Sequence, residues 1–198
     1  DLASGRTATG TVERLARHVE EHDLEVVLIL ETHAHADHLS ASQFLKRRFH
    51  APLAIGAHII EVQQVFQRVF DIDGDEVDQY AFDRLLHEGE TFNVGDLELR
   101  AMHTPGHTPA CMAYVGDGYA FVGDTLFMPD YGTARTDFPG GDARTLYRSI
   151  QKLYELPEDT RLYLCHDYLP DAGRAEYRWV TTVGEERRHN IHVRDGID

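Results

Sequence analysis

Four side chains that can bind a metal ion, His33, His35, Asp37 and His38, occupy six consecutive positions with alanines between them. The apolar residues 26–30 come shortly before them and are typical of a buried strand. Because side chains alternate along a strand, His33, His35 and Asp37 are expected on one side, and a loop or helix start adds His38. Exposed turns favour Gly, Asn, Asp, Ser and Pro over histidine. The cluster therefore predicts a metal site at the end of a strand.

Three further candidate ligands follow apolar segments later in the chain. His107 lies within the sequence Thr-Pro-Gly-His-Thr-Pro, where a rigid backbone is expected to present the side chain. Asp124 and His166 each come at the end of a predicted strand. A single His or Asp after a strand is usually a cap or a turn residue. Four such places, each at a strand end, predict one shared rim of metal ligands.

Seven other histidines carry no motif, and we expect them on the surface or in packing roles. They are His18, His22, His50, His58, His87, His189 and His192.

Length and charge limit the classes of function. The 198 residues, 42% of them apolar, fit one domain with a real core. The formal charge of −15 repels phosphate backbones and anionic lipids, so we expect neither a nucleic-acid nor a membrane partner. The longest apolar runs fall far short of the roughly 20 residues that span a bilayer, and the start of the chain lacks a signal-peptide pattern. We therefore expect a cytoplasmic protein.

The predicted elements interleave helices and strands. Apolar spacing predicts helices over residues 11–22, 39–49, 57–70, 142–155 and 181–191, with Asp142 as a helix N-cap. Strands are predicted at residues 26–30, 53–55 and 161–165, and hairpins turn at residues 95–96 and 116–118. The spacing is not that of a regular parallel sheet. An α/β fold with layers of helices over mixed sheets is the better prediction.

The motifs together resemble a known family. In order along the chain, residues 32–38, 104–108, 123–126 and 165–167 resemble the metal motifs of the metallo-β-lactamase superfamily, which implies an αββα sandwich. A closer resemblance is to persulfide dioxygenases of the ethylmalonic-encephalopathy-protein type and their bacterial relatives. It rests on residues 132–138, 166–168 and 181–187. The resemblance to glyoxalase II is more distant.

Two departures from the family pattern are visible. Members usually begin with a pair of strands before the first helix, and many continue beyond the last one. We therefore expect residues 1–198 to be a single domain trimmed at both ends and lacking the leading strands. A bare sheet edge would result, and with the acidic surface it suggests a homodimer. The connection between Asp124 and Arg135 is also longer than in the animal dioxygenase, and this affects the expected position of Arg135.

The dioxygenase resemblance implies one Fe(2+) ion per chain, held by His33, His107 and Asp124, with three positions open for substrate and O2. The substrate would be glutathione persulfide or a similar low-molecular-weight persulfide, oxidised to sulfite and free thiol. Arg135 would bind a substrate carboxylate in a bidentate fork, and Tyr168 would donate a hydrogen bond near the metal. An alternative for Arg135 is an ion pair on the surface with Asp130 or Asp137.

A resemblance to glyoxalase II implies instead a hydrolase with two Zn(2+) ions per chain, which would cleave a thioester or related ester. The ligands would be His33, His35 and His107 on one ion and Asp37, His38 and His166 on the other, with Asp124 bridging.

Asp37 and Tyr168 are the candidate catalytic residues. Because dioxygenases keep the second set of residues as hydrogen-bonding groups, the ligands do not decide between the classes. Residues 135–138 and 166–168 favour the dioxygenase. A third alternative is a noncatalytic metal-binding fragment.

Overall fold

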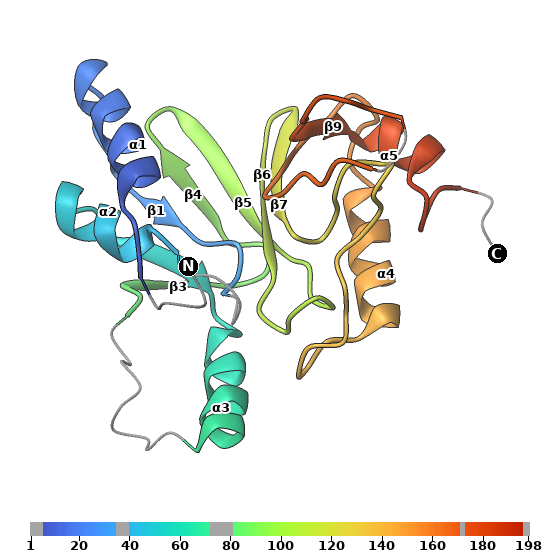
Figure 1. Ribbon diagram of the computed structural model, residues 1–198, viewed down its shortest axis with the longest axis horizontal. Coiled ribbons are helices and arrows are strands. Elements are labelled where there is room, and N and C mark those ends of the chain that lie inside the picture. Colours follow the sequence, from blue (N-terminus) through green and yellow to red (C-terminus); the bar gives the residue numbers. More distant parts are fainter. Residues whose placement is uncertain (1–5, 35–39, 72–80, 171–172, 196–198) are drawn as a thin grey trace.

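The computed structural model of the protein describes residues 6–34, 40–71, 81–170 and 173–195. Two β-sheets lie between two groups of helices, as Figure 1 shows. Helices and sheets are therefore layered in the αββα order that the motifs implied.

The first sheet is parallel. Its strands, in order across the sheet, are β1 (Ile29–Leu30), β2 (Leu53–Gly56) and β3 (Arg84–Leu86). The helices of this half are α1 (Gly10–Glu21), α2 (Ser42–Phe49) and α3 (Ile59–Phe70). Of these, α2 contacts α1, β1 and β2. This half of the chain thus alternates strand and helix.

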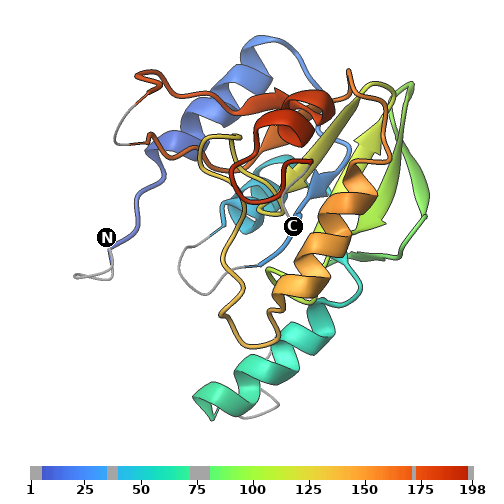
Figure 2. The same cartoon turned by 90° about the vertical axis from the view of Figure 1, so that its right-hand side faces the viewer.

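The second sheet is mixed, and its strands lie in chain order. They are β4 (Thr91–Val94), β5 (Leu97–His103), β6 (Met112–Gly116), β7 (Tyr119–Gly123), β8 (Arg161–Leu164) and β9 (Val180–Thr182). The predicted hairpin turns join β4 to β5 and β6 to β7. A parallel pairing of β7 with β8 needs a crossover, which contains α4 (Ala143–Leu153). Figure 1 shows α4 and α5 (Val183–His189) on the side away from α1 and α2, and in Figure 2 that side faces the viewer.

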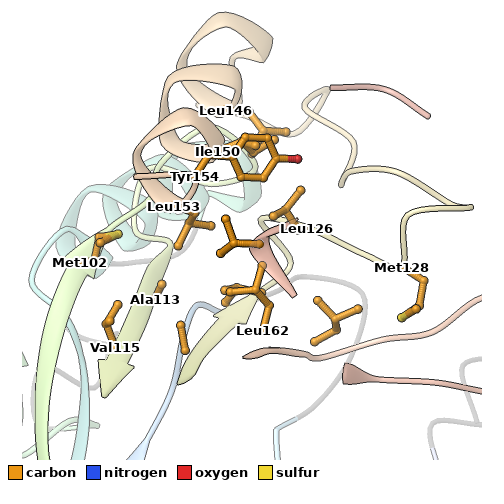
Figure 3. Close-up of a cluster of buried hydrophobic side chains, with 14 residues drawn as sticks. Met102, Ala113, Val115, Leu126, Met128, Leu146, Ile150, Leu153, Tyr154 and Leu162 are labelled. Atoms are coloured by element: carbon orange, nitrogen blue, oxygen red, sulfur yellow. The ribbon is translucent and has the colours of Figure 1, made fainter. Parts of the chain in front are cut away.

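Alternation of side chains along β5 and β6 separates two of the three apolar clusters in the described core. Ala101 and Tyr114 point toward the first sheet, where Ala54 and Leu86 pack against them. The neighbouring residues point the other way, toward α4, and form a second cluster (Figure 3). That cluster includes Met102, Ala113, Leu146, Ile150 and Leu153. Both faces of β5 and β6 are therefore covered by apolar side chains.

Asp142 caps α4 as predicted. Its carboxylate accepts a hydrogen bond of 2.7 Å from the backbone nitrogen of Thr145.

Most predicted elements differ from the structure by a few residues at their ends, and two differ in kind or extent. The strand predicted at residues 26–30 is reduced to β1, and Val27, just before it, is 41% exposed. As the first strand in its sheet, β1 pairs with β2 and with no other described strand. The helix predicted from residue 181 begins only at Val183, because Thr181 and Thr182 belong to β9. The Thr182 hydroxyl accepts from the backbone nitrogen of Glu185 at 3.1 Å and caps α5. β-branched residues favour the strand here.

Within the described parts of the chain, none of the helices combines the length and the apolar character needed to cross a membrane.

Candidate metal centre

The described candidate ligands all follow strands. His33 comes shortly after β1, His107 lies in the loop between β5 and β6, Asp124 directly follows β7, and His166 follows β8. The side chains of His33, His107 and Asp124 are buried, with 8%, 2% and 4% of their residues' surfaces exposed. The fold thus gathers on one rim residues that are far apart in sequence.

Three of these side chains form a compact group. Asp124 Oδ2 lies 3.6 Å from His33 Nε2 and 3.9 Å from His107 Nε2. One ligand atom from each of the three residues lies within 4.8 Å of the others. Metal–ligand bonds of about 2.0–2.2 Å place neighbouring ligand atoms roughly 3–4 Å apart, so a single ion fits this group. Two imidazoles and one carboxylate are donors that suit iron(II) or zinc.

Hydrogen bonds turn the same nitrogen of both histidines toward Asp124. His33 Nδ1 lies 2.9 Å from the Thr32 hydroxyl oxygen, and His107 Nδ1 donates to the backbone carbonyl of Arg135 at 2.7 Å. With Nδ1 engaged, Nε2 is the nitrogen that remains for a metal in each ring. Partners of this kind fix the ring orientation and strengthen the ligand.

Two glycines make room for the ligands that follow them. Gly123 has φ of +56°, and a β-carbon there would lie 2.8 Å from Thr32 Oγ1, the partner of His33. Gly106 has φ of +134°, and its β-carbon would lie 2.3 Å from the backbone of Leu146 in α4. Side chains other than hydrogen would strain both turns. The positions of Asp124 and His107 therefore depend on glycine at these two places.

His166 lies on the other side of the same carboxylate. Its Nε2 is 3.6 Å from Asp124 Oδ1, whereas His33 and His107 face Oδ2. The His166 side chain is 35% exposed. Asp124 is thus placed to join two groups of ligands. The other predicted members of the second group, His35, Asp37 and His38, lie outside the described residues.

A cavity of about 510 Å³ opens beside the ligands. His107 and Asp124 line it, together with the predicted substrate residues Arg135 and Tyr168. The Tyr168 ring stacks on Tyr131 with 4.6 Å between ring centroids. Phe127, Phe138 and His192 also line the cavity. Its volume is in the range that holds small organic ligands.

The Arg135 guanidinium forms an ion pair at this cavity. Its Nε and Nη2 atoms each lie 2.6 Å from an oxygen of Asp137, and the group lies over the Phe138 ring at 4.9 Å. An ion pair with Asp137 is one of the two surface pairs that the sequence analysis gave as alternatives for Arg135. The side chains of Arg135 and Asp137 are 67% and 64% exposed, so water screens the pair and it is weak. The predicted role of Arg135 in substrate binding stays a prediction.

Sequence reasoning missed the role of Arg174. Its guanidinium lies 2.6 Å from Asp167 Oδ2 and 3.0 Å from Asp130 Oδ2. Burial, the largest single influence, opposes ionisation of Asp167. The hydrogen bonds from Arg174 and from the backbone of Arg178, together with the charges of these two arginines, still hold the pKa of this carboxyl below its usual value. The bridge attaches the segment of His166 and Tyr168 to the loop that carries Asp130. No motif marks Arg174, because its partner Asp130 is distant in sequence.

Comparisons with known proteins fit this geometry. The chain is 52% identical to a probable metallo-hydrolase of Burkholderia pseudomallei over 213 residues, covering 100% of this chain and 70% of that protein. It is 48% identical to a beta-lactamase hydrolase-like protein of Xylella fastidiosa, covering 100% of this chain but only 45% of the relative. It is 33% identical to the human mitochondrial persulfide dioxygenase, with 91% and 61% covered.

A solved structure has the same fold. The crystal structure of ETHE1 from Myxococcus xanthus matches with a TM-score of 0.74 and 31% identity, covering 94% of this chain and 71% of that one. The family model described as the metallo-beta-lactamase superfamily matches residues 4–166, which include all seven predicted ligands. The chain therefore belongs to the metallo-β-lactamase superfamily.

Proposed function

We propose that this protein is a persulfide dioxygenase that uses one iron(II) ion per chain and acts on glutathione persulfide or a similar small persulfide. The observation that carries the proposal is the buried group of His33, His107 and Asp124 beside an open cavity. Two histidines and one carboxylate on one face are the ligand set of many iron oxygenases, which need open positions for substrate and O2.

The proposed reaction balances in atoms and electrons. A bound iron(II) ion supplies the redox chemistry by which a persulfide, O2 and water give sulfite and the free thiol. The chain supplies fixed ligand orientation through Thr32 and the Arg135 carbonyl. It also provides a cavity with room for the carbon chain of the thiol beside the ligands.

Two cavity residues suit a peptide-like thiol. The exposed Arg135 guanidinium can exchange Asp137 for a substrate carboxylate, because both partners of the present ion pair are largely in water. The Tyr168 hydroxyl belongs to a ring held by stacking on Tyr131 and by an edge contact with Phe127. We assign Arg135 to carboxylate binding and Tyr168 to hydrogen bonding near the metal. The motif resemblance to persulfide dioxygenases and the likeness to the Myxococcus protein support this assignment.

A second candidate is a hydrolase with two zinc ions. The specific observation in its favour is that the two oxygens of Asp124 face different histidines, His33 and His107 on one side and His166 on the other. A carboxylate so placed can bridge two ions, which together polarise a carbonyl and activate water. The similarity to a probable metallo-hydrolase also supports this alternative.

Oxygen dependence separates the two candidates. The protein is loaded with iron(II) or zinc under argon, and each form is given glutathione persulfide with O2, or a glutathione thioester without it. If the protein is a dioxygenase, we expect oxygen uptake and sulfite formation only by the iron form, and no thioester cleavage under argon. Thioester cleavage by the zinc form without oxygen uptake by the iron form would support the hydrolase. His33→Ala should remove activity in either case, and His18→Ala, on the exposed face of α1, should not.

A further inference from the structure

We propose that His192 is a substrate-binding residue, which donates a hydrogen bond from Nε2 to an amide or carboxylate oxygen on the carbon chain of the thiol. This inference deepens the proposed function and rests on it, because it concerns the same cavity. The inference also limits the class of substrate. We expect persulfides of thiols that carry an amide or carboxylate oxygen to bind better than inorganic persulfide or simple alkyl persulfides.

His192 lies on the wall of the cavity beside the candidate metal ligands. It lines this space together with Arg135, Tyr168 and Thr133. The place for its ring is created by Gly132, whose φ is +99° and where a β-carbon would lie 2.3 Å from His192 Nδ1. Any other residue at position 132 would collide with the imidazole. The backbone is thus shaped to receive this ring.

Hydrogen bonds fix which nitrogen of His192 carries the proton. The backbone nitrogen of Thr133 donates to Nδ1 at 3.1 Å, and the Thr133 hydroxyl lies 3.2 Å from the same atom. A backbone N–H can only donate, so Nδ1 must be the acceptor and the neutral ring carries its hydrogen on Nε2. Among the described residues, Nε2 has no hydrogen-bond partner. The ring therefore offers one oriented donor that the protein itself does not use.

Hydrogen bonds attach residues 190–192 to the loop that contains Pro129 and Gly132. The buried Asn190 amide donates to the carbonyl of Gly132 at 3.0 Å and to Glu186 Oε2 at 2.7 Å, and its Oδ1 accepts from the backbone of His192 at 2.9 Å. The backbone nitrogen of Ile191 donates to the carbonyl of Pro129 at 3.0 Å. These bonds join the end of α5 to the loop that carries Phe127 and Tyr131. His192 is thus preorganised, so little ordering is needed when a ligand binds.

The side chains that line the cavity favour a substrate with amide or carboxylate oxygens. A neutral N–H donor binds an amide or carboxylate oxygen, and the nearby Arg135 adds a positive charge for a carboxylate. The aromatic rings of Phe127, Tyr131 and Tyr168 give apolar surface to the same cavity. A tripeptide thiol such as glutathione offers both kinds of oxygen, whereas hydrogen persulfide offers none. The expected result is selection among thiols by their carbon chain.

Binding to the zinc-loaded protein under argon tests this inference without any turnover. The probes are glutathione, which has amide and carboxylate oxygens, and cysteamine, which has neither. We expect His192→Leu to weaken glutathione binding by about 2- to 13-fold, the value of one hydrogen bond, and to leave cysteamine binding unchanged. His192→Gln, which keeps an N–H donor, should recover part of the loss. His189→Leu, an exposed histidine of α5 that does not line the cavity, is the matched control.

Equal weakening for both thiols would assign His192 a purely structural role and overturn the inference. So would unchanged glutathione binding in His192→Leu. A measurement on the unaltered protein covers the case in which the variants fold poorly. Nitrogen NMR of the His192 ring should show the proton on Nε2, and glutathione should shift that signal more than cysteamine does. An Nδ1 proton, or equal shifts, contradicts the inference. Because no reaction is measured, failure of the dioxygenase assay would leave this result intact.

Discussion

His107 Nδ1 donates a hydrogen bond of 2.7 Å to the backbone carbonyl of Arg135. This bond connects a candidate metal ligand to a wall of the neighbouring cavity, since Arg135 and its neighbours Thr133 and Ala134 line that cavity. A shift of this segment would therefore turn the imidazole, and a shift of the imidazole would move the cavity wall. The orientation of the His107 ring and the position of the cavity wall are therefore coupled through one backbone oxygen.

His166→Ala separates the one-metal from the two-metal account. In the dioxygenase, His166 acts as a hydrogen-bonding neighbour of Asp124, 3.6 Å from Oδ1. We expect the variant to keep its iron and to lose about 10- to 100-fold in oxygen uptake, as is usual for groups that support a ligand. Elemental analysis and an oxygen electrode measure both. A fall from two ions to one, with loss of thioester cleavage, would favour the hydrolase.

Gly123→Ala should weaken metal binding. The new methyl would press on Thr32, the partner of His33, from a distance of 2.8 Å, and the backbone would keep its positive φ. We expect metal affinity to fall about 10- to 100-fold, measured by competition with a chelator. Gly118→Ala is the matched control, because Gly118 also has positive φ but nothing lies within 4 Å of its β-carbon. That variant should lose about 1–2 kcal/mol of stability and keep its metal. Equal metal loss in both would refute the packing argument.

Arg174→Leu should destabilise the protein and disturb Tyr168. The Asp167 side chain is only 1% exposed, so removal of its partner leaves a buried carboxylate without its cation. We expect unfolding by denaturant to become easier by about 3–5 kcal/mol. Arg188→Leu removes an exposed pair with Glu158, 3.3 Å long, and should cost at most about 1 kcal/mol. The account of this bridge fails if the two variants lose the same stability.

Glu186→Gln should make the protein more stable at neutral and mildly alkaline pH. Burial raises the pKa of the Glu186 carboxyl from 4.5 to about 8. Between these values the unfolded chain has lost the proton and the folded chain keeps it. The free energy of unfolding therefore falls as pH rises through this window. Each pKa unit corresponds to about 1.4 kcal/mol, so the variant should gain a few kcal/mol over the natural protein by pH 8.

Denaturant unfolding at several pH values checks this prediction for Glu186→Gln. The difference between variant and natural protein isolates Glu186, because the other titrating groups are common to both. Glutamine keeps an oxygen that can accept from Asn190, so the hydrogen bond at 2.7 Å is preserved. A difference in stability that does not change between pH 5 and 8 would show that the carboxyl is ionised throughout this window.

The group of His33, His107 and Asp124 could be predicted from the sequence because each member lies at or soon after the end of a strand. His107 and Asp124 are marked by local patterns, a proline- and glycine-rich turn in one case and a buried strand followed by glycine in the other. The helix cap at Asp142 is local as well. In such cases a few neighbouring residues determine the conformation, and periodicity is enough to recognise it.

Contacts between distant segments were not visible in the sequence. Arg174 has no motif, and its partner Asp130 becomes a neighbour only when the chain folds. His192 is exposed, in line with the expectation of a surface or packing residue. What the sequence did not reveal is that its ring accepts a hydrogen bond from Thr133 and occupies space left by Gly132, far earlier in the chain. The strand β9 was read as part of a helix, since its pairing with β8 depends on tertiary structure.

The most direct test of the account is the metal content of protein purified without oxygen, combined with oxygen uptake per bound metal ion when glutathione persulfide is added. We predict one iron per chain on His33, His107 and Asp124, with an electron paramagnetic resonance signal on nitric oxide binding and uptake that scales with iron. Two zinc ions per chain, no uptake after replacement by iron, and thioester cleavage under argon would contradict the account.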